Sequence, residues 1–181
     1  IYANSSTLTF TDGQFTTNQC SGTEGGAMWL TSCMLNMNGT DFFGNQSNGG
    51  DSSFGGAIWM TDTDGTWEGC LFQSNLADAN LNAKGGDIWM DGSNPTISNC
   101  VFEDSKANVY HDGPDNVSWT NNAEGGSLYL NGSNPQLSNF SFVGSKCVAY
   151  ARGCDGSSSG GYEYANSRAR GGALYLGSLC N

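Results

Sequence analysis

The chain has 181 residues, 37% of them apolar and 13% charged, which predicts one domain over residues 1–181 with a substantial core. Its formal net charge is −11 with only six basic residues, so its surface is expected to repel nucleic acid and anionic lipid. No apolar run reaches the roughly 18 to 20 residues of a membrane span, and we expect no membrane insertion.

The cysteine content and the polar composition indicate the cellular location of the protein. Seven cysteines, 27 glycines and few basic residues are typical of a secreted chain, so we expect an extracellular or cell-surface location. The sequence shows no signal peptide and begins at Ile1, as in a processed mature form or a piece of a longer chain.

A short sequence motif of two glycines followed by apolar and aromatic residues recurs along the chain. Its five copies are GGAMWL, GGAIWM, GGDIWM, GGSLYL and GGALYL, which start at Gly25, Gly55, Gly85, Gly125 and Gly171. Seventeen residues after the first glycine stands a phenylalanine, at Phe42, Phe72, Phe102 and Phe142. Three positions further on stand Asn45, Asn75, Ser105 and Ser145. Such a repeat indicates a solenoid, whose stacked turns stay in register.

Each glycine pair opens a predicted strand, because inward and outward residues alternate after it. The residues expected to point inward are Met28 and Leu30, Ile58 and Met60, Ile88 and Met90, Leu128 and Leu130, and Leu174 and Leu176. The opening residues IYA fall on the same positions. The outward residue of each copy is aromatic, and together they form a predicted aromatic ladder: Tyr2, Trp29, Trp59, Trp89, Tyr129 and Tyr175.

Two more short strands follow in each repeat, around a second inward position (Met37, Trp67, Ile97 and Leu137) and around the phenylalanines. Turn motifs such as DGSNP at 91–95 separate these strands. Three strands a turn predict an all-β solenoid, a right-handed parallel β-helix of about five coils spaced by about 4.8 Å. A left-handed β-helix would show a hexapeptide period, and a propeller would need antiparallel blades.

Residues at the bends have predicted roles in this stack. Asn18, Asn45 and Asn75 are expected to hydrogen-bond to one another from coil to coil. The glycines are expected to allow a sharp turn and a close approach of neighbouring coils.

The distance from each phenylalanine to the next glycine pair is variable and is greatest in the last two repeats. The insertions 106–124 and 146–170 are therefore predicted as long loops that leave one corner of adjacent coils and meet. They gather a polar and aromatic set typical of recognition loops: Tyr110, His111, Trp119, Tyr150, Arg152, Tyr162 and Tyr164. The alternative for His111 is an ordinary loop histidine, and for GSSSGG at 156–161 flexible padding.

The pairing of GGAM with FTTN, and of GGAI with FFGN and FQSN, resembles the repeat of the chlamydial polymorphic outer-membrane proteins and related autotransporter-type passenger domains. The likeness covers nearly the whole chain, and GGDI, GGSL, FEDS and FVGS each depart from it at one position. This resemblance implies an extracellular β-helix and an adhesive role.

Catalysis and metal binding have weaker support in the sequence, and no cofactor is expected. The carboxylates a glycosidase would need are Asp62, Asp64, Asp87 and Asp91, but aspartates in Asp-Gly turns are ordinarily turn formers. The word TDTDG at 61–65 places oxygens as calcium ligands would be placed but lacks a bidentate carboxylate, so a solvated turn is favoured.

Cysteines and glycosylation sequons give further candidates. Cys147 with Cys154 is a predicted disulfide, Cys70 with Cys100 forms either a bridge or a stack of buried thiols, and Cys20 with Cys33 is a third candidate pair. Cys180 is left over. The Asn45 sequon is expected to stay unmodified because it points inward, and the candidate glycosylation sites are Asn4, Asn38, Asn116, Asn131 and Asn139.

The leading functional expectation is a non-catalytic structural protein that associates with itself. Its first and last coils are incomplete, so two uncapped ends could join head to tail into filaments, helped by the aromatic ladder. Large apolar surfaces are generally covered, and the ladder is expected to contact the inserted loops, sugar rings or a neighbouring subunit. The alternatives are a fragment of a longer β-helix, and an adhesin-like carbohydrate-binding or polysaccharide-processing module.

Overall fold

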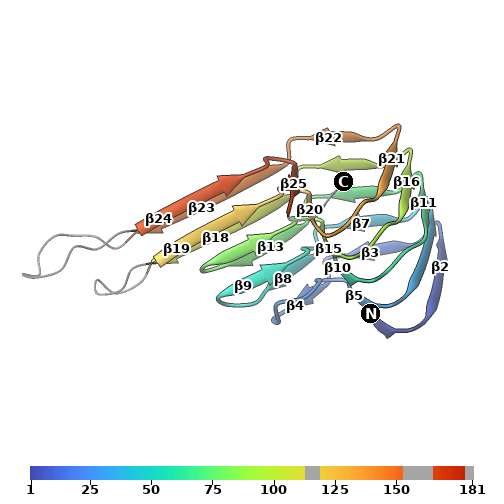
Figure 1. Cartoon of the computed structure of the whole chain (residues 1–181), viewed down its shortest axis with the longest axis horizontal. Helices are drawn as coiled ribbons and strands as arrows, with labels where there is room; N and C mark the ends of the chain where they lie inside the picture. Colours follow the sequence, from blue (N-terminus) through green and yellow to red (C-terminus); the bar gives the residue numbers. More distant parts are fainter. Residues whose placement is uncertain (113–118, 153–164, 178–181) are drawn as a thin grey trace, which may run out of the picture.

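The computed structural model describes residues 1–112, 119–152 and 165–177. These residues form parallel-paired strands and no helix, which confirms the right-handed parallel β-helix. No stretch of this described part could cross a membrane as a helix. The coils stack in register, and in Figure 1 they run from blue to red along one axis.

Three sheets enclose the main core, which we call the body (Figure 1). Sheet A consists of β1 (Tyr2–Asn4), β5 (Met28–Thr31), β10 (Ile58–Thr61), β15 (Ile88–Asp91), β20 (Leu128–Asn131) and β25 (Leu174–Leu176). Sheet B consists of β2 (Thr7–Thr11), β6 (Met34–Asn38), β11 (Thr66–Glu68), β16 (Thr96–Ser98) and β21 (Gln136–Ser138). Sheet C consists of β3 (Gln14–Thr16), β7 (Asp41–Phe43), β12 (Leu71–Gln73), β17 (Val101–Glu103) and β22 (Ser141–Val143).

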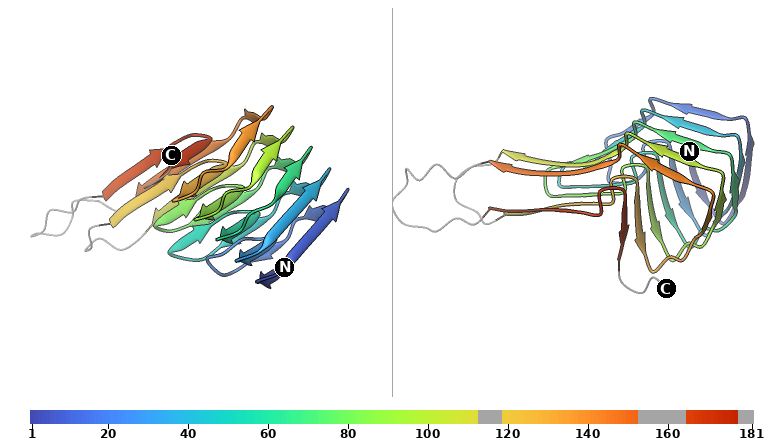
Figure 2. Two further views of the ribbon diagram at one scale, coloured as in Figure 1. Left: turned by 45° about the vertical axis from the view of Figure 1, so that its right-hand side comes forward. Right: turned by 90° about the horizontal axis from the view of Figure 1, so that it is seen from above.

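Two further sheets leave one corner of the body as a flat projection, which we call the wing (Figure 2). Sheet D consists of β4 (Gln19–Cys20), β8 (Gln46–Asn48), β13 (Leu76–Ala79), β18 (Lys106–Asp112) and β23 (Lys146–Arg152). Sheet E consists of β9 (Ser52–Phe54), β14 (Asn82–Lys84), β19 (Trp119–Glu124) and β24 (Ala165–Arg170). A full coil therefore has five strands, and the expectation of three is wrong.

The predicted insertions 106–124 and 146–170 coincide with the longest strands of the wing. They lie side by side as predicted, since β18 pairs with β23 and β19 with β24. The first and last residues of each insertion form strands rather than loops, because each of these segments pairs with a parallel strand of the neighbouring coil. Residues 113–118 and 153–164, between these strands, lie outside the described residues.

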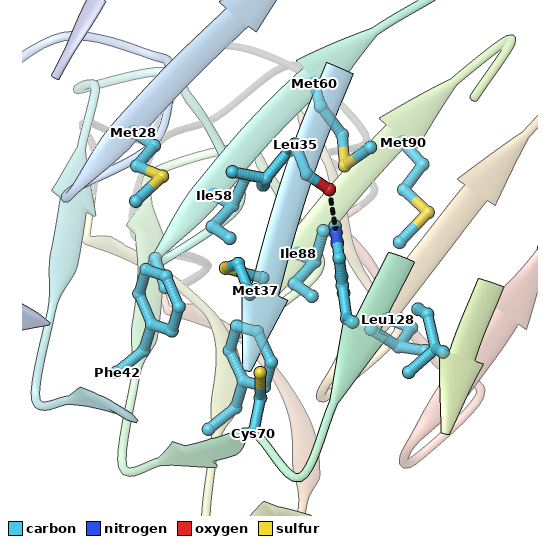
Figure 3. Packing of buried hydrophobic residues seen from close by; sticks show 14 of the residues in the cluster. Met28, Leu35, Met37, Phe42, Ile58, Met60, Cys70, Ile88, Met90 and Leu128 are labelled. Carbon is cyan, nitrogen blue, oxygen red and sulfur yellow. Dashed lines mark hydrogen bonds between the residues drawn. The ribbon is translucent and has the colours of Figure 1, made fainter. Parts of the chain in front are cut away.

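The body core is built of equivalent residues that stack from coil to coil (Figure 3). Met28, Ile58 and Ile88 point inward from successive strands of sheet A, as predicted. Leu176 in β25 is exposed, since no described strand follows in sheet A. The phenylalanines form a second ladder with neighbouring ring centroids 4.8 to 5.2 Å apart, from Phe15 through Phe42, Phe72 and Phe102 to Phe142.

The predicted asparagine ladder is also present. Asn18 Nδ2 donates to Asn45 Oδ1 at 2.8 Å, and Asn45 Nδ2 donates to Asn75 Oδ1 at 3.0 Å. Ser105 continues the ladder by accepting the Asn75 backbone N–H at 3.1 Å. Asn45 is fully buried, so its sequon points inward as expected.

The two glycines of each repeat serve different purposes. Gly55, the first of its pair, has φ +66°, a left-handed conformation that turns the chain into β10. Gly56, the second, lies between coils, and a Cβ there would overlap the carbonyl oxygen of Gly86 and lie 2.5 Å from Leu76 N. The sharp turn and the close approach predicted from the sequence thus fall on separate residues.

The wing has a core of its own, made of small side chains. Sheets D and E pack through Ala77, Ala79, Ala83, Ala107, Val109 and Ala123. In the second coil Ser47 and Ser53 take these places, and their hydroxyls are 2.6 Å apart. Small inward residues let the two sheets approach closely, which keeps the wing thin.

The described cysteines are free thiols, so Cys70 and Cys100 form the stack of buried thiols that was the alternative to a bridge, and the candidate Cys20–Cys33 bridge is absent. Cys70 and Cys100 are equivalent residues of adjacent coils. Both side chains are buried, and the backbone N–H of Cys70 donates to Cys100 Sγ at 3.4 Å. Cys20 lies on sheet D and Cys33 in the bend between sheets A and B, on different walls.

Cys147 is also free, and Cys154 lies outside the described residues. The Cys147 thiol donates to the carbonyl oxygen of Arg170 at 3.1 Å, and burial raises its pKa to about 12. A thiol of this kind is protonated at neutral pH and reacts slowly.

Candidate functional site

The aromatic ladder runs along the outer face of sheet A in parallel register, as predicted. Trp59 and Trp89 stack with ring centroids 5.0 Å apart and planes 10° apart. Their faces therefore cover each other, and mainly ring edges remain for a ligand. Tyr2 is 66% exposed but Tyr129 only 7%, so the expectation of one continuous exposed stripe is wrong.

A second ladder, on sheet E, covers part of the aromatic ladder at the corner between wing and body. Its members stand directly before the glycine pairs and pair in register; we call Phe54, Lys84, Glu124 and Arg170 the corner cluster. The Phe54 ring stacks on Trp89 with centroids 5.8 Å apart. Lys84 Nζ lies 4.6 Å from the centre of the Tyr129 ring and donates to Tyr129 Oη at 3.2 Å.

Glu124 joins the two cations of the corner cluster. Its carboxylate lies 3.6 Å from Lys84 Nζ and 3.3 Å from Arg170 Nη1, and its side chain is nearly buried. The covering of the ladder thus comes from the chain itself, through strand ends rather than through loops. Sequence reasoning missed this cluster, although the position before each glycine pair could have indicated it.

We expect Glu124→Gln to lower the free energy of unfolding by about 1–2 kcal/mol, because it leaves two cations without their shared anion. Urea unfolding at low and high salt would measure the loss, which should shrink in high salt. Arg170→Gln should lower the free energy of unfolding by less, because Arg170 is at the more exposed end of the network. An unchanged or increased stability of Glu124→Gln would show that the network does not stabilise the corner.

The outer face of sheet D is stepped, because successive coils differ in how far they extend into the wing (Figure 1). From Phe15 to Gly25 there are 10 residues, in each of the next two coils 13, and from Phe102 to Gly125 23. The wing strands lengthen accordingly, from β4 to β8 and from β13 to β18. Among the described strands two steps result, one after the first coil and one after the third, since β18 and β23 of the fourth and fifth coils are equally long.

A shallow depression lies at each step. The first has a volume of about 320 Å³ and is lined by Gln19, Cys20, Ser21, Gln46 and Asn48. The second has a volume of about 220 Å³ and is lined by Asn48, Asp78, Ala79, Asn80 and Tyr110. We call this surface, including both depressions, the stepped face.

Tyr110 and Tyr150 stand at the higher side of the second step. They pair across β18 and β23, their rings stack with centroids 5.3 Å apart and planes 7° apart, and they are 48% and 47% exposed. They belong to the predicted recognition set. His111, Trp119 and Arg152 are placed in wing strands without described side chains, and Tyr162 and Tyr164 lie outside the described residues.

Asp87 is a buried carboxylate whose role the sequence did not reveal. It occupies the inward position of Ala27 and Ala57, and its Oδ1 accepts from Asn75 Nδ2 at 2.8 Å and from Ser105 Oγ at 2.5 Å. Its Oδ2 has no hydrogen-bond partner among the described residues. Burial raises the pKa of Asp87 to about 7, and these hydrogen bonds offset the effect only in part.

Two of the other carboxylates weighed for catalysis or calcium, Asp64 and Asp91, accept hydrogen bonds from neighbouring coils. Asp64 Oδ1 accepts the Asn94 backbone N–H at 2.8 Å, and Asp91 Oδ1 accepts from Asn131 Nδ2 at 2.9 Å. Asp62 has φ +46° in its turn. Across residues 1–112, 119–152 and 165–177, no group of three or more His, Cys, Asp or Glu side chains is placed to hold a metal ion.

Glycosylation stays a prediction. The Asn4, Asn38 and Asn139 side chains are exposed and Asn131 is half-buried, whereas Asn116 lies outside the described residues. Asn131 and Asn139 use their amides as donors to Asp91 and Asn99.

No protein-family model, no curated protein and no solved structure matches this chain. The resemblance to the polymorphic outer-membrane proteins therefore stays a prediction.

Proposed function

We propose that the protein is a non-catalytic carbohydrate-binding module of an extracellular or cell-surface protein, and that the stepped face is its binding surface. The observation that carries the proposal is the composition of the two adjoining depressions, which combine amide and carboxylate side chains with an exposed tyrosine ring. Sugars are bound in proteins by such polar groups, which exchange hydrogen bonds with hydroxyls, together with aromatic rings.

The charge of the protein supports a neutral rather than an anionic carbohydrate. A net charge of −11 disfavours the approach of polyuronates or sulfated chains. Among the described residues that line the depressions, Asp78 is the one carboxylate. Hydrolysis by the usual mechanism needs two facing carboxylates about 5 to 10 Å apart, which supports binding without cleavage.

The aromatic ladder is less suited to a ligand than the stepped face. The ring faces of Trp59 and Trp89 are occupied by each other, and Tyr129 is covered by Lys84. Self-association through this ladder and through the terminal coils stays a prediction.

The proposal predicts that at least one neutral polysaccharide retards the native protein in affinity gel electrophoresis, whereas polyuronates do not. The measurement uses a panel of β-glucans, mannans, xylans and galactans, with bovine serum albumin as the unretarded control. Release of reducing sugar from the bound polymer should stay at the level of the blank. Failure of every neutral polysaccharide to retard the protein would refute the proposed function.

A further inference from the structure

We infer that the two depressions of the stepped face form one elongated site for the interior of a neutral polysaccharide chain, with Tyr110 as its aromatic platform. This inference rests on the proposed function and adds the position, polarity and length of the site. It is carried by the order of the lining residues along the coils.

The two depressions adjoin each other. Asn48 lines both of them, and the second and third coils, which have equal spacers, form the level surface between the two steps. The lining extends from Gln19 in the first coil to Tyr110 in the fourth, which is about 14 Å along the axis at about 4.8 Å a coil. That length suits a chain of several sugar rings better than a single ring.

Among the described residues, Tyr150, from the following coil, is the one ring that stacks on Tyr110, and it covers one face of the Tyr110 ring at the second step. The depression lies toward the preceding coils, since its other lining residues belong to the second and third coils, and so it borders the opposite side. The third coil is shorter than the fourth, so β13 ends at Ala79, opposite Val109, and Asn80 already lies in the turn. A strand as long as β18 would have continued beside Tyr110 and filled the depression. A π-face of this kind attracts the C–H groups of a sugar ring.

Polar groups around the ring are placed to bind hydroxyls. Asp78 Oδ1 accepts from Asn108 Nδ2 at 2.6 Å, which orients the carboxylate and leaves Oδ2 without a partner among the described residues. Asn48 and Asn80 are exposed, and their amides can both donate and accept. A carboxylate beside amides suits a pair of neighbouring hydroxyls, and it repels a sugar acid.

The first depression supplies a more polar subsite. Gln19 and Gln46 pair across β4 and β8 and place two amides beside Asn48, with no aromatic residue in the lining. A sugar there would be held by hydrogen bonds alone, which contribute less than stacking plus hydrogen bonds. The two subsites are therefore expected to be unequal, with Tyr110 dominant.

The test measures affinity against chain length, by isothermal titration with mono- to hexasaccharides of the neutral polysaccharide that retards the protein. Affinity is expected to rise at least tenfold from the monosaccharide to the tetrasaccharide and then to level off. Tyr110→Ala should weaken hexasaccharide binding at least tenfold. Gln46→Ala should weaken the hexasaccharide about threefold and leave the monosaccharide unchanged.

Phe43→Ala is the matched control, because Phe43 is an equally exposed aromatic on sheet C that lines neither depression. Circular dichroism and thermal melts of all variants verify that they fold. Equal affinity for mono- and hexasaccharide, or wild-type binding that survives Tyr110→Ala, would overturn this inference and leave the proposed function intact. Absence of binding by the wild type would overturn both.

Discussion

Replacing Asp87 with asparagine is expected to raise the free energy of unfolding at pH 8 by up to about 4 kcal/mol. The carboxylate is fully buried, and its pKa is raised from 3.8 to about 7 in the folded protein. A raised pKa means that the folded state holds the proton more tightly than the unfolded state. The contribution of Asp87 to stability is therefore greatest below about pH 4 and is lost as the pH rises to about 7, where the charged form must be buried.

Asparagine keeps the acceptor oxygen for Asn75 and Ser105 but cannot ionise. Urea unfolding at intervals between pH 4 and pH 8 should show a falling stability for the wild type and a smaller decline for Asp87→Asn. Asp51→Asn, at an exposed turn of the wing, serves as the control and should follow the wild type. If the two variants have the same pH profile, Asp87 does not carry the effect.

Gly56→Ala is expected to destabilise the protein by about 3 kcal/mol or more. The added Cβ would overlap the Gly86 carbonyl oxygen and lie 2.5 Å from Leu76 N, and both are backbone atoms that cannot move without separating the coils. Chemical denaturation would measure the loss, and hydrogen exchange should locate it in the third and fourth coils.

Gly172→Ala provides a matched control for this substitution. Gly172 is the second glycine of the last repeat, and the nearest atom to a Cβ there, the Ser145 carbonyl oxygen, is 4.0 Å away. Neither glycine has a positive φ, so the two variants differ mainly in the approach of a neighbouring coil. Equal losses in both would mean that coil spacing is not the reason for the second glycine.

The body could be predicted from the sequence because its inward residues are large and regularly spaced. Met28, Ile58 and Ile88 recur three residues after a glycine, and Phe42 and Phe72 recur at a fixed distance, so their stacking could be predicted without coordinates. The asparagine ladder followed from the same alignment.

The wing could not be predicted in the same way. Its inner residues are small, such as Ser47, Ser53 and Ala77, and the segments QSN and SSF show no apolar alternation. Their strands form because a neighbouring coil offers a parallel partner, which is a tertiary effect. Tyr110 and Tyr150 were predicted to come together on two loops, but their pairing in strands was not predicted, and the depression beside Tyr110 depends on the shorter coil that precedes it.

The unequal extension of the coils has a consequence for how such a surface can vary over evolution. The two wing strands of each coil pair only with wing strands of the neighbouring coils, so residues gained or lost between a phenylalanine and the next glycine pair change the length of one coil in the wing and leave the body in place. The shape of the stepped face thus depends on the number of residues between each phenylalanine and the next glycine pair. New ligand shapes are accessible through insertions and deletions, without any substitution in the core.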